Sequence, residues 1–121
     1  EQQTELIEQG KKLGDEDKIE EAIALLKRVV AANPKNAVAH EELGIAHFRN
    51  GDKTEAVKSF EQAIKSDHDY PSPYYSLGKI HELSGDSAEA AKAYKNYLAR
   101  NPDDEEGVEY AKQFINTFES K

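Results

Sequence analysis

Residues 40–60 read HEELGIAHFRNGDKTEAVKSF, and the pattern of this stretch indicates the architecture because it recurs 34 residues later. Residues 74–94, YYSLGKIHELSGDSAEAAKAY, keep the Leu-Gly, Gly-Asp and Glu-Ala pairs at the same spacing. Gly10 and Ala22 extend the same step towards the start of the chain. A fixed period of roughly 20–50 residues is typical of stacked repeat proteins, which act through the extended surface that their repeats create.

Composition excludes several classes of protein. The net charge of −8 argues against nucleic acid as a partner, because phosphate binding needs clustered Lys and Arg. The chain has no cysteine, so it has neither a disulfide framework nor a thiolate metal site. No apolar run approaches the roughly 18 residues of a membrane span. We therefore expect a soluble protein without membrane insertion, and the cytoplasm and the periplasm are both compatible with it.

The period divides the chain into three units, at about residues 3–36, 37–70 and 71–104. In the second unit His40, Leu43, Gly44 and His47 share one face at i, i+3, i+4 and i+7, and in every unit a later set of mainly apolar residues recurs at i, i+4, i+7 and i+8. These spacings predict two amphipathic helices per unit. The remainder contains one more apolar stripe, at about residues 104–119. A stack exposes its last apolar face unless something covers it, so this stripe is predicted to form a seventh, capping helix.

Turn signals separate the two helices of each unit. In the second unit Asp52 and Glu55 have the spacing of a capping box, and the third unit repeats it. The first unit departs from this pattern: Gly14 falls early, and Asp17 with Glu20 is the nearest capping pair. We expect a shorter first helix or a looser turn there.

These residues resemble the tetratricopeptide repeat family, whose signature runs W-x₂-L-G-x₂-Y…A-x₃-F…P. The third unit carries the signature positions as Tyr74, Leu77, Gly78, His81, Ala90, Tyr94 and Pro102. The resemblance implies an all-α fold, a right-handed superhelical alpha-alpha solenoid of three helix-turn-helix units in a single domain over residues 1–121. It also implies a protein–protein interaction scaffold or adaptor that binds a partner peptide or helix in a concave groove.

No arrangement of side chains indicates catalysis or a cofactor. His40, His47 and His81 stand at signature positions usually held by large aromatic residues, which favours packing between helices over metal binding. His81 and Glu82 do not extend into a zinc-binding H-E-x-x-H motif, because Gly85 stands where the second histidine is needed. We therefore predict no enzyme activity, no cofactor and no metal site.

A second face of each first helix is not needed for the stack, and the resemblance implies that these faces line the groove. The candidate partner-binding residues are Ile7, Lys11, Val38, Glu41, Ile45, Phe48, Arg49, Tyr75, Lys79 and Glu82. Ile45 and Phe48 suggest an apolar binding patch, with the alternative that Phe48 packs on the next unit. Lys11, Arg49 and Lys79 favour a ligand that combines an apolar anchor with an acidic group.

Some members of the family hold the C-terminal carboxylate of chaperone tails with a clamp of Lys, Asn, Asn, Lys and Arg. The matching positions here are Ile7, Lys11, Glu42, Ser72 and Ser76. Only Lys11 is basic, and Glu42 would repel a carboxylate. The sequence therefore disfavours a clamp of this kind.

Two other functions remain open from the sequence. The protein could self-assemble into a homo-oligomer, through the uncapped first unit or through Phe114 and Phe118 of the last helix. It could also be a targeting domain excised from a larger multidomain protein, which the complete coding sequence would decide.

Overall fold

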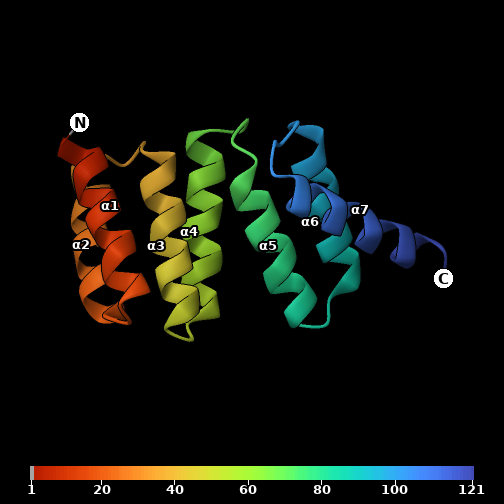
Figure 1. The fold of residues 1–121 in the computed structure, drawn as a ribbon, viewed down its shortest axis with the longest axis horizontal. Helices are drawn as coiled ribbons and strands as arrows, with labels where there is room; N and C mark the ends of the chain where they lie inside the picture. Colours follow the sequence, from red (N-terminus) through yellow and green to blue (C-terminus); the bar gives the residue numbers. More distant parts are fainter. Residues whose placement is uncertain (1) are drawn as a thin grey trace. The chain divides into compact units, whose positions relative to one another are not determined.

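The computed structural model describes residues 2–121, and this part of the chain forms seven helices and no strands (Figure 1). The helices are α1 (Gln2–Asp15), α2 (Ile19–Ala32), α3 (Ala37–Arg49), α4 (Lys53–Ser66), α5 (Ser72–Leu83), α6 (Ser87–Ala99) and α7 (Glu105–Glu119). The predicted all-α class, with three helix pairs and a seventh helix, is confirmed. Within residues 2–121, no helix has the length and apolar character that crossing a membrane requires.

The helices belong to two compact units. The first unit runs to His68 and holds α1–α4, and the second covers Asp69–Lys121 and holds α5–α7. In the first unit α1 packs on α2, α2 on α3, and α3 on α4. In the second unit α6 packs on both α5 and α7. Each helix pair is joined by a turn of three residues, so its two helices run antiparallel.

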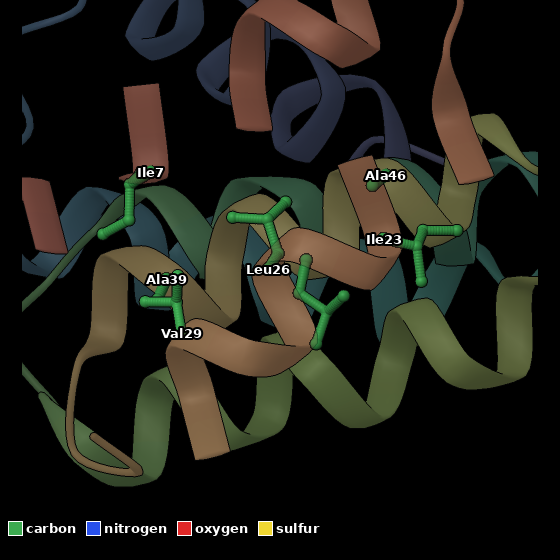
Figure 2. Close-up of a cluster of buried hydrophobic side chains, with 7 residues drawn as sticks. Ile7, Ile23, Leu26, Val29, Ala39 and Ala46 are labelled. Atoms are coloured by element: carbon green, nitrogen blue, oxygen red, sulfur yellow. The ribbon is translucent and has the colours of Figure 1, made fainter. Parts of the chain in front are cut away.

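The core of the first unit lies where α1, α2 and α3 meet (Figure 2). Its buried side chains are Ile7, Ile23, Leu26, Val29, Ala39, Leu43 and Ala46. On α2 and α3 these side chains recur at the amphipathic spacing, which turns one apolar stripe of each of the two helices inward. Burial of these side chains holds α3, the first helix of the second repeat, against both helices of the first repeat.

Small residues stand where the two helices of a pair meet. A Cβ added at Gly44 would lie 2.8 Å from Cε1 of Phe60, and one added at Gly78 would lie 2.5 Å from Cε1 of Tyr94. Ala56 on the opposing helix is fully buried. The aromatic ring on the second helix therefore fills the space that the glycine leaves on the first.

The capping residues of two turns are confirmed. The side chain of Asp52 accepts a hydrogen bond from the backbone N–H of Glu55 at 3.1 Å, and Asp86 accepts one from Glu89 at 3.2 Å. Each bond satisfies one of the N–H groups that the start of a helix leaves unpaired. Asp52 and Asp86 thus define where α4 and α6 begin.

The prediction for the first turn is wrong. Asp17 does not cap α2; it adopts a left-handed conformation with φ 66°, whereas the same place in the other two turns holds Gly51 and Gly85 at φ 84°. Lys18 stands at the N-cap and makes no capping bond with its side chain. The turn keeps the common length, and α1 is not shortened. Asp is one of the few residues that tolerate the left-handed region, so the periodic turn survives without its glycine.

Candidate binding surfaces

An apolar strip runs along α3 in the first unit and consists of Val38, Ile45 and Phe48. Val38 is 42% exposed, and Ile45 and Phe48 are half-buried. Their spacing places them on one side of the helix, over about three turns. We call these residues the α3 strip, and they form the apolar part of the predicted surface.

Two predicted surface residues lie in the interior instead. Ile7 is 5% exposed and belongs to the core cluster in Figure 2, and Glu41 is 4% exposed. The expectation that both side chains lie on an open face is therefore wrong. The reason is that α1 packs against α3 as well as α2, so the side of α1 that carries Ile7 is covered within the unit.

The two predicted cations of the first unit each have an acidic neighbour. The Nζ atom of Lys11 lies 3.9 Å from Oε2 of Glu8, and Nη1 of Arg49 lies 3.2 Å from Oδ1 of Asp15, the last residue of α1. Exposed pairs of this kind contribute about 1 kcal/mol or less. A ligand carboxylate would therefore compete with carboxylates that the chain already supplies.

Glu42 lies near these cations but is not among the predicted partner-binding residues. Burial raises the pKa of its carboxyl from 4.5 to about 7, and the charge of Glu41 adds to the effect. Lys11 and Arg49 lower the pKa, but they do not offset the burial. The carboxyl of Glu42 therefore holds its proton to higher pH than an exposed glutamate does. The adjacent glutamates at 41 and 42 were the available signal in the sequence.

In the second unit, Glu82 links α5 to the two helices that follow. Its Oε1 accepts a hydrogen bond from the hydroxyl of Tyr94 at 2.8 Å, and its Oε2 accepts one from the hydroxyl of Tyr110 at 2.5 Å. The bond to Glu82, together with burial, raises the pKa of Tyr110 to about 12. Because Tyr94 lies on α6 and Tyr110 on α7, this carboxylate ties α5 to both of them.

Lys79 and Tyr75 join the same cluster. The Nζ atom of Lys79 lies 3.6 Å from the ring centroid of Tyr110 and 5.6 Å from that of Tyr75, which is cation–π geometry. The three predicted residues of α5 are thus brought together, but α7 engages all of them. Tyr110 was missed because it lies beyond the last complete repeat, where the period gives no guide.

A cavity opens beside this cluster at the start of α5. Its volume is about 180 Å³, and its walls are formed by Tyr70, Pro71, Ser72, Tyr75, Tyr97, Pro102, Asp103 and Asp104. The rings of Tyr75 and Tyr97 are tilted by 51° with centroids 5.0 Å apart. Burial raises the pKa of both hydroxyls, and the charge of Asp104 is the next cause in each case. Tyr75 is the one member of this wall among the predicted partner-binding residues.

None of the described residues, 2–121, forms a group of three or more His, Asp or Glu side chains that could hold a metal ion. The histidines that the signature placed at packing positions include His40 and His47, and both are buried. The Nε2 atom of His40 lies 2.7 Å from the carbonyl oxygen of Pro34, which fixes the ring against the preceding loop.

Comparison with known proteins identifies the repeat. The family model described as "Tetratricopeptide repeat" matches residues 7–71 and 43–105, which together span most of the chain. No curated protein sequence matches the chain.

Solved structures share the fold over nearly the whole chain. The Yersinia enterocolitica type III secretion chaperone SycD, in complex with a peptide of the translocator YopD, is 13% identical with a TM-score of 0.87, over 96% of this chain and 91% of that one. The first repeat domain of Spaghetti (RPAP3), bound to the HSP90 peptide SRMEEVD, is 23% identical with a TM-score of 0.82, over 96% and 92%. The MamA protein is 26% identical with a TM-score of 0.75, over 94% and 68%.

Proposed function

The chain belongs to the tetratricopeptide repeat family, and from this we propose that it is a non-catalytic interaction scaffold that docks a partner peptide or helix on its first helices. The α3 strip is the observation that carries the proposal. Val38 is exposed although it is apolar, and Ile45 and Phe48 continue the row along the same helix. A row of apolar side chains at helical spacing suits the anchors of a peptide or an amphipathic helix.

Similar proteins support this function by analogy. SycD and RPAP3 are each described in complex with a peptide of another protein. The carboxylate clamp is a poor model for this chain, because Ile7 is buried in the core and Glu42 occupies another clamp position. We therefore propose that apolar contacts with the α3 strip supply most of the affinity.

The test is the selection of binders from a random peptide library displayed on phage, followed by affinity measurements with variants. Val38→Asp and Phe48→Ala should each weaken the selected peptides by about tenfold, because truncated or charged anchors cost 1–2 kcal/mol or more. Leu83→Asp is the matched control, since Leu83 is apolar and 64% exposed but lies outside the strip. Circular dichroism checks that each variant is folded. An equal loss of affinity with Leu83→Asp, or no loss with the strip variants, would exclude the α3 strip as the peptide-binding site.

Self-assembly is the second candidate, and the second unit offers the observation for it. Phe118 on α7 is 37% exposed and Leu83 is more exposed still, whereas Phe114 packs edge-on against Tyr94 at 5.2 Å. Of the two phenylalanines expected at such an interface, Phe118 is therefore the more available. Sedimentation over a concentration series, repeated with Phe118→Asp, separates a homo-oligomer from a monomer.

A further inference from the structure

The cavity at the start of α5 is too small for a typical cofactor but large enough for one side chain. Its volume of about 180 Å³ lies below the roughly 300–1,000 Å³ of small-molecule sites. It is formed entirely by the second unit and so does not include the α3 strip. Its chemistry can therefore be considered separately from that of the strip.

The walls combine aromatic faces with acidic groups. Tyr75 and Tyr97 contribute rings whose centroids are 5.0 Å apart, and Asp103 and Asp104 lie on the α7 side. None of the residues that form the walls is a lysine or an arginine. The negative charge in this cavity is therefore not neutralised from its own walls.

The carboxylates of Asp103 and Asp104 lie close to the tyrosine side chains of the cavity. Burial is the largest cause of the raised pKa of both tyrosine hydroxyls; the charge of Asp104 is the next cause in each case, and Asp103 adds to the effect on Tyr97. A Cβ at Gly107 would lie 2.5 Å from the hydroxyl of Tyr97 and 2.8 Å from Oδ2 of Asp104. The glycine thus lets a phenol and a carboxylate converge at the start of α7. A cation placed among these groups would be attracted by ring faces and by carboxylates together.

Elsewhere in the same unit, tyrosine rings already hold cations. The guanidinium carbon of Arg100 lies 4.2 Å from the ring centroid of Tyr74, and Lys79 lies over Tyr110. Neither cation is part of the cavity wall. The second unit therefore already places cations over tyrosine rings, and the half-buried ring of Tyr75 also lines the cavity, beside the buried ring of Tyr97.

We propose that this cavity receives an arginine side chain of a partner peptide, with the guanidinium stacked on Tyr75 and paired with Asp103 and Asp104. This inference rests on the proposed peptide-binding function and specifies its ligand. Arginine suits the site better than lysine, because its planar group stacks on aromatic rings and donates two parallel hydrogen bonds to a carboxylate. The overall charge of −8 also attracts a basic peptide over a longer range.

The test uses a short peptide, acetyl-Gly-Gly-Arg-Gly-Gly-amide, titrated into the full chain and followed by NMR of the tyrosine rings. The control peptide replaces arginine with citrulline, which has nearly the same shape and no charge. The arginine peptide should shift the ring signals of Tyr75 and Tyr97, and the citrulline peptide should bind at least about fivefold more weakly. Asp103→Asn and Asp104→Asn should each lower the affinity about two- to fivefold. Asn is also a good N-cap, so α7 keeps its start in the second variant.

Glu105→Gln is the matched control, because it removes a carboxylate at the start of α7 that is not part of the cavity wall. An equal loss in this variant, or equal binding of the citrulline peptide, would overturn the arginine site. The outcome is distinguishable from failure of the proposed function. Peptides that depend on Val38 but not on Asp103 or Asp104 would leave the scaffold function standing and remove the arginine cavity alone.

Discussion

At the scale of single residues, the burial of Glu42 on α3 makes the free energy of unfolding depend on pH. Its carboxyl is half-buried, and the groups that act on it are Glu41 on its own helix, Lys11 and Glu8 on α1, and Arg49. The folded chain holds its pKa near 7, above the ordinary 4.5. The folded state therefore binds more protons than the unfolded state between these two values. The contribution of Glu42 to the free energy of unfolding is greatest below pH 4.5 and falls as the pH rises to about 7.

Glu42→Gln should remove this pH dependence. At pH 8 we expect the variant to be more stable than the native chain by about 1 kcal/mol, a value reduced for solvent screening of a half-exposed group. At pH 4 the two proteins should be equal. Urea unfolding at both pH values measures the difference, and Glu61→Gln, at an exposed position of α4, is the control. A variant less stable than the native chain at pH 8 would contradict the claim that the ionised carboxylate of Glu42 destabilises the folded state.

At the scale of elements, α2 begins without the side-chain cap that α4 and α6 have. Lys18 occupies the N-cap without a side-chain bond, and Glu21 stands three residues later, where the other units place Glu55 and Glu89. The substitution Lys18→Asp would complete the device that α4 and α6 already use. We expect it to raise the free energy of unfolding by about 1 kcal/mol, because an Asp cap satisfies a free N–H and favours the helix dipole. Thermal unfolding measures this.

Lys18→Ala separates the cap from the loss of the lysine, since alanine removes the charge and adds no acceptor. If both substitutions change the stability equally, the gain does not come from capping. The same turn contains Asp17 in the left-handed region. Both variants leave Asp17 unchanged, so its backbone conformation does not contribute to the difference between them.

The 34-residue period predicts the regular features of the fold, and the predictions that failed did so for physical reasons. The helix pairs and two caps follow from spacing alone. The first turn was misjudged because Asp17 has two common roles, as a cap and as a left-handed residue, and only the backbone distinguishes them. Ile7 was placed on a free surface because periodicity does not reveal how closely α1 approaches α3.

At the scale of the whole molecule, the two compact units should respond separately to a local defect. The Cβ of Gly78→Ala would lie 2.5 Å from the ring of Tyr94, and such overpacking costs about 1–3 kcal/mol. Because repeat proteins are stabilised mainly by neighbouring contacts, we expect amide exchange to accelerate about tenfold or more in α5 and α6, and less in α1 and α2. Gly44→Ala should instead accelerate exchange mainly in α3 and α4, and less in α5 and α6. Equal acceleration in both units would show that they unfold as one.

The turn at Gly85 also offers a place for engineering. A Cβ at this position would meet no atom within 4 Å, and the turn follows the end of α5, whereas the tyrosine-lined cavity lies at the beginning of that helix. A helix of 12 residues separates the two ends by roughly 18 Å. A fluorophore or an affinity tag inserted after Gly85 would therefore report on ligand capture without blocking it, whereas a label near either terminus would lie beside α1 or α7.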